Sequence, residues 1–154
     1  MKAVIQRVTS ASVEVEGKIV GSCNEGFLVL LGAADGDTEA DVDIIARKIA
    51  NLRVFCDEND KMNLSVLDID GEILAISQFT LLADVKKGNR PSFINALEPQ
   101  SAEKLYDLFC EKLSENGVKR VEKGIFGADM KVSLVNDGPV TIIYDTEIWR
   151  KNEN

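Results

Sequence analysis

The sequence predicts an α+β fold, in which a mostly antiparallel, barrel-like β-sheet packs with two main helices. Short runs rich in β-branched residues recur along the chain, whereas apolar residues recur at helical spacing in only two segments, 39–51 and 102–115. The chain has 154 residues, of which 45% are hydrophobic. This size and composition predict a single domain, residues 1–154, built around one core.

The first half of the chain predicts strands around one helix. The run 26–32 is continuously apolar between two glycines, which predicts a central strand buried on both faces. Acidic residues begin the helix predicted over 39–51 and basic residues follow, an order that suits the helix dipole. A tight turn is predicted at Glu16-Gly17 and a hairpin at Asp70-Gly71. The other predicted strands are 3–8, 12–16, 18–21, 53–56, 65–69 and 72–82.

The second half predicts the second helix and the last strands. A basic, glycine-containing loop at 84–91 leads to the helix over 102–115, which stops at Asn116-Gly117. Gly138-Pro139 interrupts a β-rich stretch, and the preceding Asp-Gly pair indicates a turn between two strands. The residues after Ile148 predict a polar, frayed tail. These last strands are predicted at 118–122, 130–135 and 140–144.

Composition excludes several classes of function. The chain contains no His, which removes Ser-His-Asp and Cys-His catalysis and the commonest metal ligand. Its three cysteines are far apart and form no CxxC, so we predict buried free thiols in a reducing cytosol. The sequence singles out no metal site and no cofactor. No apolar run is as long as a membrane span and no export signal is recognised, so we predict a cytoplasmic protein without a membrane partner.

The charge of the chain limits how it can meet nucleic acid. A net charge of −8 argues against broad, unspecific binding, because such binding needs Lys and Arg to displace counterions. It leaves room for a small site that takes one end of a nucleic acid. Basic residues do gather locally, at Lys86, Lys87 and Arg90 and at Lys119, Arg120 and Lys123, and the alternative for both clusters is an ordinary solvated surface.

Two segments are candidates for chemistry. Ser77-Gln78-Phe79-Thr80 ends an apolar strand just before the basic loop, and its hydroxyls, amide and ring suit a polar ligand. Thr80 as a nucleophile needs a Lys or carboxylate base, whereas backbone N–H groups there would form an oxyanion hole. The alternative is a strand that becomes polar as it surfaces. In Gly138-Pro139, the glycine lets a ligand or another chain approach closely, and the bond before proline can be cis.

Together, Ser77–Leu81 and Asn136–Thr141 resemble the D-aminoacyl-tRNA deacylase family. The resemblance runs over nearly the whole chain, with further matching segments at 6–8, 28–32, 87–93 and 126–130. It implies a homodimeric, cytoplasmic hydrolase that cleaves the ester between a D-amino acid and the 3′-terminal adenosine of tRNA. It also implies clearance of glycine from mischarged tRNA, and hence a role in proofreading during translation.

The resemblance also implies roles for individual residues. Gly138 and Pro139 would form a chiral filter, joined by a cis bond, whose carbonyls enter the partner subunit's pocket and collide with an L-side chain. Arg7 would hold this arrangement. The first motif would line the catalytic pocket with Ser77, Gln78, Phe79 and Thr80, of which Thr80 is better suited to positioning than to nucleophilic attack.

Two further groups of residues would meet the RNA. By the same resemblance Phe126 and Met130 hold the terminal adenine, for which plain core packing is the alternative. Lys86, Lys87 and Arg90 are candidate phosphate contacts.

Two other functions remain open at this point. One is a related deacylase of altered chirality, which carries a trans Gly-Pro bond and a different residue before the threonine of the first motif. The other is a non-catalytic module that binds nucleotides or RNA ends.

Overall fold

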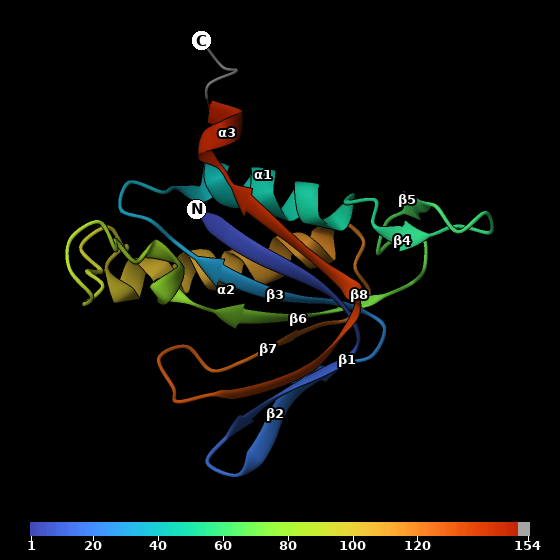
Figure 1. Ribbon diagram of the computed structural model, residues 1–154, viewed down its shortest axis with the longest axis horizontal. Helices are drawn as coiled ribbons and strands as arrows, with labels where there is room; N and C mark the ends of the chain where they lie inside the picture. Colours follow the sequence, from blue (N-terminus) through green and yellow to red (C-terminus); the bar gives the residue numbers. More distant parts are fainter. Residues whose placement is uncertain (151–154) are drawn as a thin grey trace.

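The computed structural model describes residues 1–150 and has the predicted α+β class, with two long helices beside a sheet that curves into a nearly closed barrel (Figure 1). The strands are β1 (Lys2–Val15), β2 (Lys18–Cys23), β3 (Gly26–Gly32), β4 (Phe55–Cys56), β5 (Met62–Leu64), β6 (Glu72–Ser77), β7 (Val121–Lys123) and β8 (Lys131–Asp145). The helices are α1 (Glu39–Ala50), the 3-10 helix η1 (Phe79–Leu82), α2 (Pro99–Glu115) and the short α3 (Glu147–Arg150). Within these residues, no helix is both long enough and apolar enough to cross a membrane.

Strand β1 organises the sheet. Its first half pairs antiparallel with β3 and its second half with β2, while β8 pairs along nearly its whole length on the other edge. Strands β3, β6 and β7 follow in order as parallel neighbours. The barrel nearly closes where β2 approaches β7: a Cβ on Gly21 would lie 2.5 Å from the Lys123 carbonyl oxygen, so this approach requires glycine.

Alternate residues of the central strands serve two apolar cores. On β3, Phe27 and Val29 face the core shared with α1 and α2, whereas Leu28 faces the core inside the barrel. Strand β6 divides in the same way, with Ile73 toward the helices and Leu74 toward the barrel. The prediction that 26–32 is buried on both faces is therefore confirmed.

Two predicted strand pairs are single strands. The segments 3–8 and 12–16 form the continuous β1, and the segments 130–135 and 140–144 form the continuous β8. The predicted turn at Gly138-Pro139 was therefore wrong, because β8 pairs with β1 on both sides of it. A proline is tolerated there since the chain bulges away from its partner and needs no ladder hydrogen bond.

Three other predictions also differ from the structure. No strand forms over 65–69, because Ser65 and Asp68 bond each other's backbone in a local turn that competes with a ladder. Asp70-Gly71 forms a turn but no hairpin, because no strand precedes it to pair with β6. The predicted strand 72–82 ends at Ser77.

The predicted frayed tail is partly wrong. Trp149 packs edge-on against Tyr144, with ring centroids 5.2 Å apart. Arg150 forms ion pairs with Asp37, which lies just before α1, and with Asp41, which lies in the first turn of α1. The rest of the tail, 151–154, lies outside the described residues.

Candidate functional site

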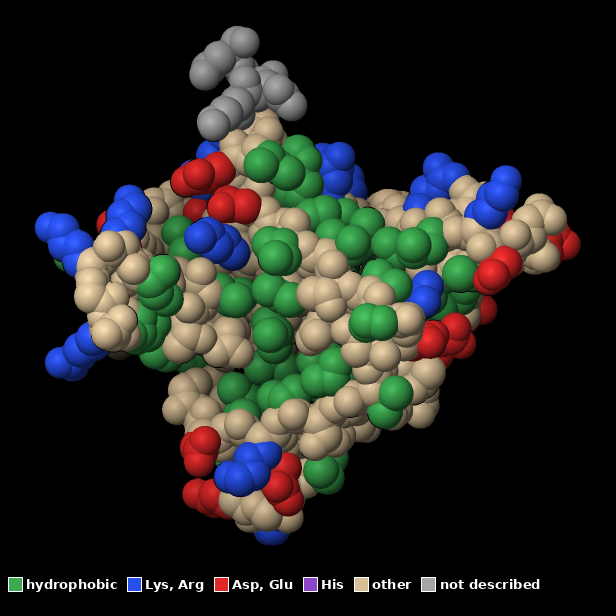
Figure 2. Space-filling model, in the orientation of Figure 1, with side chains coloured by type: hydrophobic (Ala, Val, Ile, Leu, Met, Phe, Trp, Pro, Cys, Tyr) green, Lys and Arg blue, Asp and Glu red, His purple; other side chains and the backbone are tan. Residues whose placement is uncertain are grey.

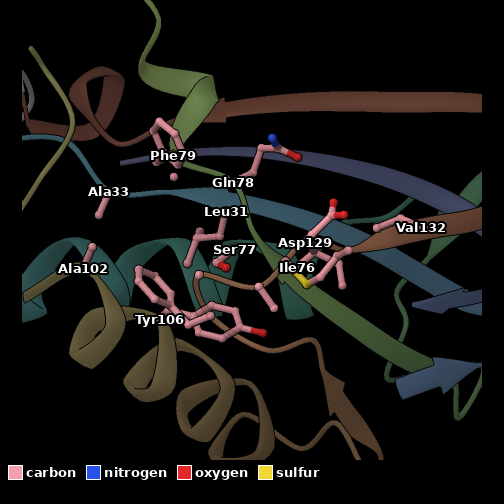
Figure 3. Close-up of a pocket in the computed structure, with 15 residues that line it drawn as sticks. Leu31, Ala33, Ile76, Ser77, Gln78, Phe79, Ala102, Tyr106, Asp129 and Val132 are labelled. Atoms are coloured by element: carbon pink, nitrogen blue, oxygen red, sulfur yellow. The ribbon is translucent and has the colours of Figure 1, made fainter. Parts of the chain in front are cut away.

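A hollow of about 280 Å³ lies where β3 and β6 end, and we call it the β3–β6 pocket. Figure 3 shows its lining, which comes from the ends of both strands, from η1, from α2 and from the segment between β7 and β8. Its residues are Leu31, Gly32, Ala33, Ile76, Ser77, Gln78, Phe79, Ala102, Tyr106, Phe126, Gly127, Ala128, Asp129, Met130 and Val132. Most of the first motif therefore meets both of the predicted adenine-binding residues.

The pocket exists because the chain leaves the sheet after Ser77. Ser77 still pairs with Leu31, and the Gln78 amide donates to the Leu31 carbonyl at 2.8 Å. The next residues then turn into η1, which carries Phe79 outward, where 57% of it is exposed. Gly32 permits this turn, since a Cβ there would lie 2.7 Å from the Gln78 carbonyl oxygen.

The start of η1 presents backbone donors beside the pocket. The first N–H groups of a helix have no intrahelical acceptor, and the side chain of Gln78 does not cap them. The side-chain amide of Gln78 instead donates through Nε2 to the Thr80 hydroxyl. Thr80 lies next to the pocket and is exposed, so its backbone N–H and that of Phe79 are candidate donors to a carbonyl oxygen that gains charge.

Aromatic and thioether side chains form the opposite wall. Phe126 lies 6.2 Å, centroid to centroid, from Tyr106, and the Met130 sulfur fills the space that a Cβ on Gly124 would need. Phe126 lines the pocket and also packs on the helix-side core, so the packing expected as the alternative is present, and adenine binding stays a prediction. Such a wall suits the flat, apolar faces of a nucleobase.

Tyr106 is a pocket residue that the sequence analysis missed. Its hydroxyl donates to the Ala75 carbonyl at 2.6 Å, which ties α2 to the strand that carries the first motif. Burial, and to a smaller extent Cys110, raises the pKa of Tyr106 above its ordinary value, so the hydroxyl remains a donor at neutral pH. The available signal was a tyrosine next to the apolar stripe of α2, because a buried tyrosine usually finds a hydrogen-bond partner.

The second motif forms a bulge on β8, residues 137–140, opposite Arg7. Gln6 pairs with Thr141 and Val8 with Asn136, so four residues of β8 face the single Arg7 of β1. The Gly138-Pro139 bond is cis, as the resemblance implies. Both residues are exposed.

Two side chains hold this bulge. Arg7 donates through Nε to the Asp137 carbonyl at 2.9 Å and through Nη1 to the Val54 carbonyl at 2.6 Å. Asn136 spans the base of the bulge: its Oδ1 accepts from the Val140 amide at 2.8 Å and its Nδ2 donates to the Thr141 hydroxyl at 3.0 Å. The sequence analysis assigned no role to the Asn136 side chain.

The bulge and the β3–β6 pocket do not meet within one chain. Arg7 pairs with Phe27, whereas the pocket begins at Leu31, four residues further along β3. At about 3.3 Å per residue this separation is about 13 Å. Neither Gly138 nor Pro139 lines the pocket.

The three predicted phosphate contacts lie on the exposed loop that follows η1. Lys87 and Arg90 line no described pocket, and Lys86 borders a separate, mostly polar hollow near Asp84 and Asp145. For a metal, residues 1–150 offer no cluster of three or more Cys, Asp and Glu side chains.

Comparison with known proteins concerns the family and the fold of the chain. A family model described as D-Tyr-tRNA(Tyr) deacylase matches residues 4–145. A solved structure described as a c-Myc DNA unwinding element binding protein is 46% identical, with a TM-score of 0.89, over 94% of this chain and 98% of its own. Another, described as a probable eukaryotic D-amino acid tRNA deacylase, is 18% identical, with a TM-score of 0.78, over 93% and 97%, and shares the fold.

Proposed function

The chain belongs to the D-Tyr-tRNA(Tyr) deacylase family, and we propose that its β3–β6 pocket binds the 3′-terminal adenosine of tRNA and presents the ester to water. As a family member it is a hydrolase that removes D-amino acids from tRNA. The observation that carries the proposal is the meeting of Gln78 and Phe79 with Phe126 and Met130 around one hollow. The adenine lies against the Phe126 wall, and the ester then reaches the start of η1.

Catalysis in this arrangement needs few side chains. An aminoacyl ester is already activated, so fixed orientation supplies much of the rate enhancement. Water attacks the ester carbonyl carbon, and the oxygen that gains charge accepts from the amides of Phe79 and Thr80. The ribose 3′-oxygen leaves with a proton, and the neighbouring 2′-hydroxyl of the substrate assists that transfer. Thr80 positions the substrate, since its hydroxyl already accepts from Gln78.

Selection against L-amino acids is assigned to the bulge of a second copy. Backbone carbonyls of Gly138 and Pro139 obstruct the position of an L-side chain and leave a D-side chain free toward solvent. The obstacle does not depend on which side chain is present, so it serves many amino acids. Glycine has no side chain to obstruct, and mischarged glycine is therefore also a substrate.

The separation between bulge and pocket supports a homodimer. About 13 Å along β3 keeps the bulge out of its own pocket, whereas an exposed bulge can enter the pocket of a second copy related by a two-fold axis. Apolar side chains run down the middle of the face where β8 lies, as Figure 2 shows. On β8, Val135 is 55% and Ile143 72% exposed. We place this dimer in the cytoplasm, where tRNA is charged.

The dimer is tested by sedimentation and by selectivity measured on the same samples. Ile143→Asp puts a charge on the proposed interface, so we expect a monomer that discriminates poorly between D- and L-esters. Ile19→Asp alters a similarly exposed isoleucine on β2 and should leave both properties unchanged. A wild-type protein that sediments as a monomer at assay concentration contradicts the shared site.

The activity itself is tested with matched substrates. Tyrosine tRNA is charged with D-Tyr or with L-Tyr, and loss of each ester is followed with and without the protein. We expect the D-ester to disappear much faster than the L-ester, and glycine on a non-cognate tRNA to be cleared as well. Equal rates of hydrolysis for the D- and L-esters would contradict the proposal.

The role of Thr80 is tested separately. Thr80→Ala should retain measurable turnover, because the backbone N–H groups remain. Thr80→Ser keeps the hydroxyl and serves as the control. Complete loss in the first variant with full activity in the second would instead assign Thr80 as a nucleophile.

A binding module without catalysis is the second candidate. It is favoured by the 46% identity to a protein described as binding a DNA element. The net charge of −8 disfavours broad contact with duplex phosphates. Tight binding of duplex DNA or of adenosine, with no ester turnover, would favour this candidate over the deacylase.

A further inference from the structure

Loop 84–95, which joins η1 to α2, combines exposed apolar side chains with unpaired cations. Val85 is 71%, Ile94 81% and Phe93 37% exposed. Figure 2 shows apolar side chains among Lys and Arg side chains at the left end of the molecule, where this loop lies in Figure 1. Within residues 1–150, the three cations of the loop form no salt bridge, whereas Lys112, Lys119, Arg120 and Lys123 each do.

The loop has a fixed position, and its Phe93 lies against Phe79, which lines the β3–β6 pocket. Asp84 and Ser92 exchange two backbone hydrogen bonds, of 2.7 and 2.9 Å, that close it. Its end is bound to the residues that follow β3, where Asp35 donates to Asn95 and Leu97 donates to Ala33. The Phe93 ring meets Phe79 edge to face, with centroids 5.1 Å apart. The two rings form an aromatic ledge beside the pocket.

The pocket is small, so the nucleotides before the terminal adenosine need a binding surface outside it. At about 280 Å³ it is just below the roughly 300–1,000 Å³ that drug-sized ligands occupy. In the proposed function this small pocket holds the terminal nucleoside and its ester. The nucleotides before that adenosine are single-stranded at a tRNA 3′ end and must pass over the rim. Aromatic side chains with cations beside them are the usual means of holding single-stranded nucleic acid.

We propose that Phe93 stacks on a base of the nucleotides that precede the terminal adenosine, while Lys86, Lys87 and Arg90 contact their phosphates. This inference rests on the proposed function and extends its site beyond the terminal nucleoside. Phe93 is a substrate-binding residue that acts on the RNA and not on the amino acid. A net charge of −8 disfavours broad contact with RNA, so a contact limited to a small basic region such as this loop is favoured.

The test compares two substrates that share the reacting ester. D-tyrosyl-tRNA carries the preceding nucleotides, and D-tyrosyl-adenosine lacks them. Base stacking is worth about 1–3 kcal/mol per base, so Phe93→Ala should lower kcat/KM for D-tyrosyl-tRNA by about 5- to 150-fold. The value for D-tyrosyl-adenosine should stay within about twofold. Phe93→Trp, which keeps a stacking face, should restore the tRNA value.

Two controls separate this role from others. Ile19→Ala removes a distant exposed apolar side chain and should affect neither substrate. Changing Lys86, Lys87 and Arg90 together to Ala should reduce the slope of log affinity against log salt by up to about 2, since each single-strand phosphate contact contributes about 0.7. The proposal is overturned if Phe93→Ala lowers kcat/KM equally for D-tyrosyl-tRNA and D-tyrosyl-adenosine, or lowers it for neither substrate. A changed sedimentation coefficient also overturns it, because Phe93 would then belong to a protein interface.

Failure of the proposed function would look different. In that case the wild-type protein hydrolyses neither ester. The ledge is then tested by fluorescence anisotropy with the trinucleotide cytidine-cytidine-adenosine, and with adenosine alone as competitor. Phe93→Ala should weaken binding of the trinucleotide at least fivefold and leave adenosine unchanged. Equal affinities of the two proteins for the trinucleotide would overturn the proposal independently of catalysis.

Discussion

Asn136→Ala should reduce chirality discrimination without unfolding the protein. The change removes both hydrogen bonds across the base of the bulge. Thr141 is exposed and its hydroxyl can turn to water, so that bond contributes little. The Val140 amide is partly buried and loses its acceptor, which costs about 1 kcal/mol. A bulge loosened by that amount should lower the ratio of kcat/KM for D-Tyr-tRNA over L-Tyr-tRNA by about fivefold.

Asn136→Asp provides a sharp comparison. A carboxylate still accepts from the Val140 amide, and it also accepts from the Thr141 hydroxyl, because a hydroxyl both donates and accepts. This variant should therefore keep the wild-type ratio. Asn116→Ala is the matched control, since Asn116 donates to the Lys112 carbonyl at the end of α2, far from the bulge in sequence. It should lower Tm and leave the ratio unchanged.

Ester loss from the two charged tRNAs measures the ratio, and thermal unfolding measures stability. The reasoning is refuted if Asn136→Ala keeps the wild-type ratio, or if Asn116→Ala lowers the ratio by the same factor. A loss in Asn136→Asp equal to that in Asn136→Ala would show that the amide serves in some way other than accepting from Val140.

Three further predictions concern backbone strain, thiol reactivity and acid stability. Gly138→Ala should weaken discrimination more than Asn136→Ala, because a φ of +136° strains any other residue by about 1–3 kcal/mol and the added Cβ would lie 2.8 Å from a Val140 methyl carbon; an unchanged ratio would contradict this. Burial raises the pKa of Cys110 to about 12 and, with Glu72, that of Cys23 to about 11, so iodoacetamide at pH 8 should add one group by mass, at exposed Cys56. Burial opposes ionisation of Asp41, but hydrogen bonds from the Thr38 backbone and Arg150 outweigh it and lower its pKa. Its stabilisation is therefore complete above about pH 4 and lost as the pH falls through the lowered value, and Asp41→Asn should flatten this acid loss in urea titrations.

The long, regular patterns were readable from the sequence. The apolar run 26–32 and the helical spacing of 39–51 depend on local residue order, and the structure has both elements close to their predicted bounds. The first motif and the wall residues Phe126 and Met130 were identified by resemblance. The structure brings Ser77, Gln78 and Phe79 of that motif together with both wall residues around one pocket, and Thr80 lies next to it.

What the sequence did not reveal depends on partners far away in the chain. Nothing local shows that Asp137–Val140 is a bulge inside one strand, because β1 supplies the pairing on both sides. The segment 65–69 was mistaken for a strand because most of its residues are apolar, and nothing in that pattern shows that Ser65 and Asp68 bond each other's backbone. Tyr106 was missed for a similar reason, because it matters through a hydrogen bond to Ala75, 31 residues earlier in the chain. Asn136 was missed because only the bulge brings its side chain to the Val140 amide and the Thr141 hydroxyl.

The pairing of β1 with β8 has a consequence for how the chain folds as it is made. Lys2 pairs with Asp145, so one edge of β1 has no pairing partner until β8 has left the ribosome. At about 5–20 residues per second this wait lasts on the order of ten seconds. During that time β1 presents an open edge to any other nascent chain. This protein is therefore expected to fold slowly and mostly after synthesis, and to depend on chaperones when it is produced at high concentration.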